Sequence, residues 1–159
     1  MTTKNTDLIA NFEASPQVAN NAAELAGVLR TAHGTVELAA GDSTDNDIVM
    51  LAPIPSNAAV PQLFIGSDTF GGSCTFNVGL YTSAGVVKDE DAFATSVADA
   101  GAMTDVRFEV ADLNTGSQKL WQLAGDSTDP GGYYYVAITF DATGGTAGSL
   151  NWNINYIVD

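Results

Sequence analysis

Residues 150–158 have the sequence LNWNINYIV, and this stretch decides the fold. Asparagines occupy positions 151, 153 and 155. Apolar residues occupy the alternate positions, Leu150, Trp152, Ile154, Tyr156 and Val158, and Ile157 follows the asparagines on their side. A period of two is typical of a β-strand with one face on a hydrophobic core and the other in water. The stretch therefore predicts a strand with Trp152 on its core side and a solvated asparagine row.

Seven other short apolar runs precede this strand, with Gly, Pro, Asp and Ser between them, and each predicts a strand. They span residues 28–38, 47–52, 60–66, 75–81, 106–110, 119–123 and 133–140. We expect the second run to be closed by Pro53 and Pro55. Short strands at close, regular spacing are typical of an antiparallel sandwich or barrel. Residues 28–159 are therefore predicted to form an all-β, antiparallel β-sandwich of jelly-roll type, with an immunoglobulin-like sandwich as the alternative.

Two segments depart from the strand pattern. Residues 89–100 predict the one short helix, because their acidic start suits the positive end of a helix dipole and Phe93 and Val97 fall at helical spacing. Residues 1–27 predict an extended N-terminal arm. Its apolar residues are expected to anchor on the sandwich or on a neighbour, and a frayed terminus is the alternative. They are Leu8, Ile9, Phe12, Val18 and Leu25.

The composition of the chain excludes several classes of partner. The 159 residues include 19 Asp and Glu but 5 Lys and Arg, which gives a net charge of −14. So few cations cannot neutralise a phosphate backbone or hold an anionic membrane, so we expect neither nucleic-acid nor membrane partners. A hydrophobic fraction of 45% favours a folded core over disorder. We find no signal peptide and no membrane-spanning run, which predicts synthesis and folding in a cytoplasm.

Acidic turns are the candidates for a metal site. The sequence GDSTD occurs at residues 41–45 and again at 125–129, each time between predicted strands. Asp and Ser hydrogen-bond to their own backbone and Gly supplies positive φ, so two equivalent turns explain the repeat without a ligand. Solvated turn carboxylates are the interpretation adopted, and a bound divalent cation stays the alternative. The carboxylates concerned are Asp42, Asp45, Asp47, Asp89, Glu90, Asp91, Asp126 and Asp129.

Catalytic patterns are weak. His33 is the one histidine and Cys74 the one cysteine, which excludes an internal disulfide and a Cys/His zinc site. No nucleophile elbow is present, and Cys74 has no basic neighbour to lower its pKa. A pair of carboxylates could catalyse glycoside hydrolysis, but no motif in the sequence singles out such a pair. We therefore expect no enzymatic activity and no cofactor. Tyr133 and Tyr135 lie opposite the apolar face of their strand and are candidates for an interface.

Residues 36–81 carry a resemblance to a known family. They combine a strand, an acidic turn, DIVML at 47–51, PIPSNA at 53–58, a strand ending in Ser67 and Asp68, and TFNVGLY at 75–81. This order resembles the small capsid decoration (cement) proteins of tailed double-stranded-DNA bacteriophages. The resemblance covers roughly residues 28–110, and the strand at 148–156 fits the same group. It implies a jelly roll on the outer capsid surface that bridges capsid subunits, and it offers no catalytic residues.

The sequence thus predicts a virion structural protein whose partners are the major capsid protein and further copies of itself, a trimer being favoured over a dimer. The alternatives are a lectin-like glycan-binding module that uses loop carboxylates, with or without calcium, and a neck or tail accessory protein. The residues expected at the interface are Leu8, Ile9, Phe12, Val18, Leu25, Tyr133 and Tyr135.

Overall fold

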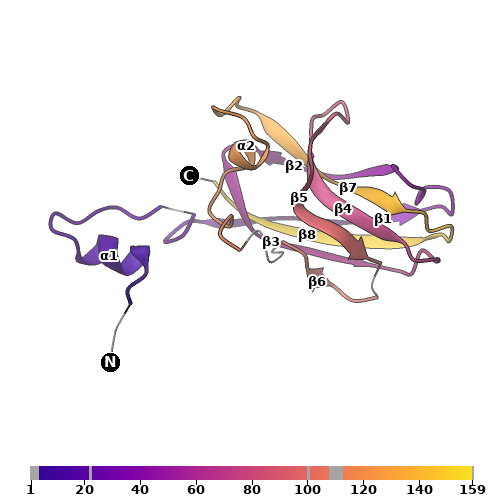
Figure 1. Cartoon of the computed structure of the whole chain (residues 1–159), viewed down its shortest axis with the longest axis horizontal. Coiled ribbons are helices and arrows are strands. Elements are labelled where there is room, and N and C mark those ends of the chain that lie inside the picture. Colours follow the sequence, from indigo (N-terminus) through magenta and orange to yellow (C-terminus); the bar gives the residue numbers. More distant parts are fainter. Residues whose placement is uncertain (1–3, 22, 100, 108–112, 159) are drawn as a thin grey trace.

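The computed structural model describes residues 4–21, 23–99, 101–107 and 113–158. In these ranges eight strands form two four-stranded antiparallel sheets that pack face to face (Figure 1). Sheet I has the order β1 (Leu29–Leu38), β8 (Gly148–Val158), β3 (Ala58–Ser67) and β6 (Thr104–Asp105). Sheet II has the order β2 (Ile48–Pro55), β7 (Tyr133–Ala142), β4 (Thr75–Tyr81) and β5 (Val87–Ala98).

This strand order confirms the predicted jelly roll. Strands 1, 8, 3 and 6 in one sheet and 2, 7, 4 and 5 in the other correspond to two interleaved Greek keys of an eight-stranded jelly roll. The immunoglobulin-like alternative groups its strands differently. The chain crosses between the sheets at most of its turns, so both sheets contribute to one core.

β8 lies in the interior of sheet I and pairs along its length with β1 on one side and β3 on the other. Leu150 and Ile154 are fully buried, and Trp152 is half-buried against the core, as the alternation predicted. Gly34 of β1 lies directly opposite Trp152, where a Cβ atom would be 2.9 Å from the indole ring. The absence of a side chain at Gly34 therefore makes room for the indole, and β1 continues through this glycine without interruption.

The core between the sheets contains a cluster of aromatic side chains. Phe140 of β7 makes edge-to-face contacts with Phe70 and Phe76, with ring centroids 5.7 and 6.0 Å apart. All three rings are almost completely buried. Such perpendicular pairs stabilise a core beyond the area they bury. They join β4 and β7 of sheet II to the segment that follows β3 of sheet I.

The helix predicted at residues 89–100 is wrong, because this segment forms β5. Its pairing with β4 is irregular: between Leu80 and Val78 the partner on β5 changes from Asp89 to Ala94. The extra residues on β5 interrupt the alternation that would have revealed a strand. Phe93 is fully buried. Packing on the core therefore overrides the helical spacing and the acidic start.

Two other predicted strands also differ. Lys119 makes an isolated bridge to Ala59, and residues after it form the short helix α2 (Leu120–Leu123). The side chain of Gln122 accepts a hydrogen bond from the Lys119 N–H at 2.8 Å, which favours a helical turn over an extended strand. The strand predicted at 106–110 falls largely outside the described residues, and β6 lies just before it.

β2 does not end at Pro53 but continues through it to Pro55. A proline cannot donate a ladder hydrogen bond, so it is tolerated where one side of the strand is free. β2 is an edge strand of sheet II, which satisfies this condition. The prolines therefore mark a sheet edge rather than a strand end.

The arm contains a helix that the sequence analysis did not predict. α1 (Asp7–Glu13) lies beyond one end of the sandwich and buries none of its residues (Figure 1). The chain then returns in an irregular path to β1. With seven and four residues, neither helix of the described ranges is long enough to cross a membrane.

Arg107 is a fully buried cation that sequence reasoning missed. Its Nε donates to the carbonyl of Val60 at 2.8 Å, and its Nη2 donates to the carbonyl and hydroxyl of Thr115 at 3.1 and 3.0 Å. Its guanidinium carbon lies 5.1 Å from the centroid of the Phe93 ring, which is a cation–π distance. Arg107 therefore connects β3, β5 and the loop before α2.

We predict that Arg107→Ala lowers the free energy of unfolding by about 3 kcal/mol, because it leaves buried carbonyls without a donor and opens a cavity. Urea unfolding measures the change. Arg30→Ala, which removes an exposed arginine, is the control and should change it by less than about 0.5 kcal/mol. Equal losses in the two variants would contradict the structural role of Arg107.

Gly79 of β4 yields a second prediction. A Cβ atom there would lie 2.1 Å from the carbonyl oxygen of Asp89 and 2.3 Å from the backbone of Glu90, so Gly79→Ala must displace the irregular part of β5. We expect a loss of about 2 to 3 kcal/mol in unfolding free energy. The control is Gly41→Ala, where nothing lies within 4 Å, and it should leave thermal stability almost unchanged.

Candidate interaction surfaces

The arm exposes most of the apolar side chains that were expected at an interface. Phe12 is 66% exposed, Ile9, Val18 and Leu25 are also exposed, and Leu8 is half-buried. Phe12, Val18 and Leu25 line one open hollow of about 400 Å³, so the structure brings these three together. The arm thus presents a concave apolar surface away from the sandwich.

Asparagine side chains hold this part of the arm in shape. Asn11 Nδ2 donates to Asn20 Oδ1 at 2.8 Å, and Asn20 Nδ2 donates to the carbonyl of Leu8 at 3.2 Å. The backbone N–H of Val18 donates to the carbonyl of Asn11 at 3.1 Å. These bonds connect α1 to the segment that follows it. The arm is therefore locally folded around α1 and is not the simple extended segment predicted from the sequence.

The two candidate tyrosines lie on β7, not in the arm. Tyr133 is 63% exposed and stands opposite Pro55, while Tyr135 is half-buried between Pro53 and Tyr81. Tyr133 therefore offers an exposed aromatic surface at the start of β7, beside the edge strand β2. Tyr135 is partly used by packing within the sheet.

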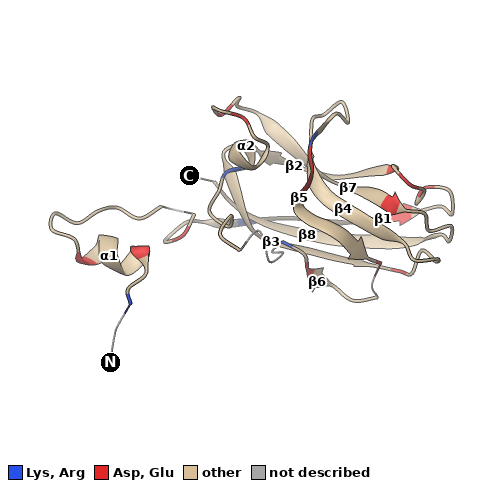
Figure 2. Cartoon of the chain, viewed as in Figure 1, with Lys and Arg blue, Asp and Glu red and all other residues tan. Residues whose placement is uncertain are grey.

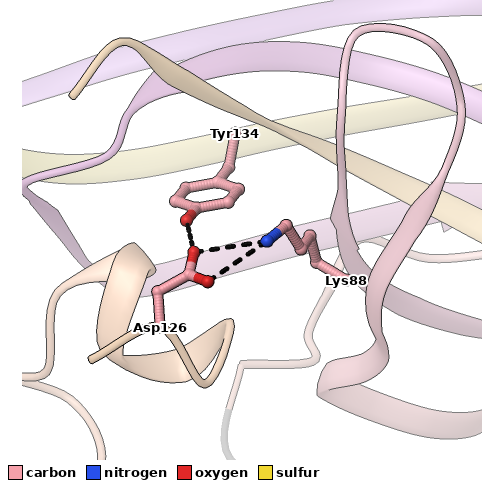
Figure 3. Close-up of polar contacts among 3 residues, drawn as sticks. All are labelled: Lys88, Asp126 and Tyr134. Carbon is pink, nitrogen blue, oxygen red and sulfur yellow. Dashed lines mark hydrogen bonds and ion pairs between the residues drawn. The ribbon is translucent and has the colours of Figure 1, made fainter. Parts of the chain in front are cut away.

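Tyr134, between them, belongs to a polar cluster that the sequence analysis did not identify. Its hydroxyl donates to the carboxylate of Asp126, and Lys88 Nζ lies 3.2 and 3.4 Å from the two oxygens of that carboxylate (Figure 3). The hydrogen bond from Tyr134, followed by that from Lys88, lowers the pKa of Asp126. Burial, followed by the hydrogen bond to Asp126, raises the pKa of Tyr134. The cluster connects the second acidic turn to β5 and β7.

The first acidic turn uses its carboxylates locally. Asp42 Oδ2 accepts the Ala39 N–H at 2.8 Å, and Asp47 Oδ2 accepts the Thr44 N–H at 2.9 Å. The hydrogen bonds to Thr44 lower the pKa of Asp47. In the described ranges no three His, Cys, Asp or Glu residues are grouped so that they could hold a metal ion. Hydrogen bonding within the turns thus accounts for these two carboxylates.

The second GDSTD turn is not equivalent to the first. It follows α2 rather than a strand, and Asp129 Oδ1 accepts the hydroxyl of Ser56 at 2.6 Å and the Gly131 N–H at 2.9 Å. Asp126 binds Tyr134 and Lys88 as described. The two GDSTD turns therefore have the same sequence but make different contacts.

Sheet I presents a polar surface with few charges to solvent, which we call the amide face. Thr31 Oγ1 donates to Asn153 Oδ1 at 3.1 Å, and Thr35 Oγ1 donates to Asn151 Oδ1 at 2.6 Å. These cross-strand bonds hold the asparagine row in order on the wet side, as predicted. Its neutral polar side chains include Thr31, His33, Thr35, Gln62, Asn151, Asn153 and Asn155, and Glu37 and Phe64 lie on the same face.

An open hollow of about 430 Å³ lies on the amide face. His33 lines it from β1, and residues 101–103 line it as well. Met103 lies over Gly66 of β3, where a Cβ atom would be 2.9 Å from the Met103 sulfur. Neutral amides and hydroxyls dominate the surface, so it is suited to hydrogen bonding with an uncharged polar partner.

Acidic residues lie mostly outside sheet I. Figure 2 shows them in α1, in the turns and at the start of β5, whereas β3 and β8 carry no charged residue. β1 carries only Arg30 and Glu37, and β6 carries Asp105. The surface therefore divides into acidic turns and a sheet with few charges.

Cys74 offers no reactive thiol. Its side chain is 1% exposed, and burial, followed by the negative charges of Asp99 and Asp141, raises its pKa. A thiol with a raised pKa is a poor nucleophile. Cys74 is therefore a small side chain of the hydrophobic core.

Comparison with known proteins identifies the fold. No family model and no curated protein matches the chain. Among solved structures, the chain is similar to one in the capsid of Ralstonia phage GP4, with 13% identity, a TM-score of 0.59, and coverage of 84% of this chain and 86% of that one. It also matches a chain of the cyanophage Pam1 capsid asymmetric unit (20% identity, TM-score 0.46, coverage 84% and 86%). A third match is in the acidic stable capsid of Helicobacter pylori bacteriophage KHP30 (13%, 0.38, coverage 82% and 88%).

The cluster of Tyr134 and Asp126 predicts a pH dependence. A lowered pKa on Asp126 stabilises the fold above the unfolded-state pKa of this carboxyl, and this contribution is lost as the pH falls through the folded-state value. A raised pKa on Tyr134 has the opposite sign: its contribution is lost as the pH rises above about 10. We therefore expect Tyr134→Phe to lower the melting temperature at pH 7, and the difference from the wild type to shrink below pH 4 and above pH 10.

Tyr133→Phe is the matched control, because the Tyr133 side chain is exposed. Thermal melts across the same pH range should show no pH-dependent difference between this variant and the wild type. A pH-independent difference for Tyr134→Phe would contradict the coupling.

Proposed function

We propose that the protein is a structural component of a tailed-phage virion, a decoration (cement) protein that binds the outer surface of the head and bridges major capsid subunits. The observation that carries this proposal is the arm, which holds exposed apolar side chains away from a sandwich that already has its own core. The shared fold with the GP4 capsid chain supports it. The proposal includes no enzymatic activity.

The arm is suited to docking on a large partner. Phe12, Val18 and Leu25 form one apolar hollow, and the asparagine bonds around it reduce the conformational entropy that docking would cost. The acidic turns keep free copies apart and soluble. Many copies on one shell would act together, so each contact needs only modest affinity.

Tyr133 and Tyr135 form the second part of the proposed interface. Tyr133 offers an exposed ring beside an edge strand that Pro53 and Pro55 stiffen. Tyrosine is favoured at protein interfaces because it combines apolar area with a hydrogen-bonding hydroxyl. Because the arm and the tyrosines lie on different elements, they are suited to contact two different capsid subunits.

We predict that the double variant Phe12→Ser, Val18→Ser binds capsids roughly a hundredfold more weakly than the wild type, because each side chain would bury about 1 to 2 kcal/mol of apolar surface. Binding is measured by co-sedimentation with particles that lack the protein. Such particles should regain their resistance to heat with the wild-type protein but not with this variant.

The control is the double variant Val86→Ser, Leu113→Ser, which removes two exposed apolar side chains outside the arm. Both variants should melt at the wild-type temperature in isolation. Equal binding by the two variants would exclude the arm as the docking segment. Recovery of the protein with necks or tails rather than heads would favour the accessory role over decoration.

A further inference from the structure

The four edge strands of the sandwich differ in how they are protected. β1 and β6 form the edges of sheet I, and β2 and β5 form those of sheet II. An edge strand has unpaired N–H and C=O groups, which are a template for pairing with another chain. Proteins protect such edges with short strands, prolines, bulges or charges.

Three of the four edges in the described ranges carry such devices. β6 has two residues. β2 contains Pro53 and Pro55, and its pairing with β7 shifts register between Met50 and Ala52. β5 pairs irregularly with β4, has a positive φ of 49° at Ser96 and carries acidic residues at 89–91. These edges are therefore poor templates for an added strand.

β1 has none of these devices. Its ten residues pair with β8 in unbroken register from Leu29 to Leu38. It contains no proline and no residue with positive φ, and its two charges, on Arg30 and Glu37, cancel. We expect a long, regular edge without net charge to pair with another chain when the protein is in its functional assembly.

Charge identifies a second copy of this chain as a suitable occupant. Two molecules of net charge −14 repel each other wherever their acidic turns meet. β1 has no net charge, and its neighbours β8 and β3 carry no charged residue. Sheet I is therefore the side along which two copies can approach with the least repulsion.

The centre of β1 is also self-complementary. Its three central side chains on the amide face, Thr31, His33 and Thr35, read the same in both directions, and Leu29 and Glu37 lie beyond them at the two ends of the strand. Antiparallel pairing about His33 places Thr31 opposite Thr35 of the second copy, and threonine pairs across strands are favourable. Because Arg30 and Glu37 lie near opposite ends of the strand, this arrangement places no like charges opposite each other.

We propose that β1 pairs with β1 of a second copy, antiparallel and about a two-fold axis at His33, so that the two four-stranded sheets become one continuous eight-stranded sheet. Such an interface is isologous and closes at a dimer. The two arms would leave at opposite ends of the joint sheet, free to dock. This proposal goes beyond the capsid role and does not rest on it, and it replaces the expected trimer with a dimer.

Disulfide trapping tests the axis. In an antiparallel pair, directly opposite residues have Cα atoms about 4.5 to 5.5 Å apart, within the range that a disulfide spans. We therefore expect His33→Cys to form a covalent dimer in nearly full yield under mild oxidation. The buried native thiol of Cys74 stays outside the reaction. Ser83→Cys, in an exposed turn, is the control and should stay monomeric on a non-reducing gel. Similar yields for both variants would overturn the proposal.

Light scattering during size-exclusion chromatography tests the pairing without a cross-link. The wild type should be a dimer, and Thr31→Lys, Thr35→Lys should raise the dimer dissociation constant at least tenfold, because each lysine then faces another across the axis. Ser127→Lys, Thr128→Lys adds the same charge on an exposed loop and should leave the dimer intact. Circular dichroism confirms that the variants are folded. A wild-type monomer or trimer, or equal loss in both variants, would overturn the proposal. The arm variants test capsid binding separately, so a failure there leaves this result unaffected.

Discussion

The pairing of β8 between β1 and β3 is the constraint on which the rest of the molecule depends. Because β8 is paired on both sides, its alternation fixes which residues of sheet I face the core and which face water. Leu150 and Ile154 reach the core on one side, and the asparagine row forms the amide face on the other. A shift of one residue would reverse both faces at once, so the register of β8 sets the core and the surface together.

The sequence was informative where strands alternate cleanly and uninformative where they do not. β4, β7 and β8 were predicted within about two residues, and the two-sheet jelly roll follows from the number and spacing of the strands. β5 was mistaken for a helix because its irregular pairing over Gly79 removes the alternation. That irregularity depends on a close approach between strands far from any local signal, and a single sequence does not reveal it.

The candidate surfaces, too, could be predicted from the sequence only in part. The sequence indicated the apolar side chains of the arm as interface candidates, because they lie in a segment with no regular pattern to bury them, and the structure leaves most of them exposed. Arg107 and the cluster of Lys88, Asp126 and Tyr134 were missed, because their partners come together only through the fold. The two GDSTD turns were identical as letters but differ in their contacts, since their neighbours differ. Local composition thus indicated the apolar side chains of the arm, whereas the specific polar contacts could be found only once the topology was known.

The separation of acidic turns from a sheet with few charges has a consequence for the ionic surroundings of the molecule. A body with a net charge of −14 gathers a cloud of counterions, and that cloud concentrates over the turns rather than over sheet I. At about 0.1 M salt the field of the turns decays within roughly 10 Å. Crowded copies would therefore approach more easily as ionic strength rises, the reverse of the behaviour of proteins that hold nucleic acids through cations.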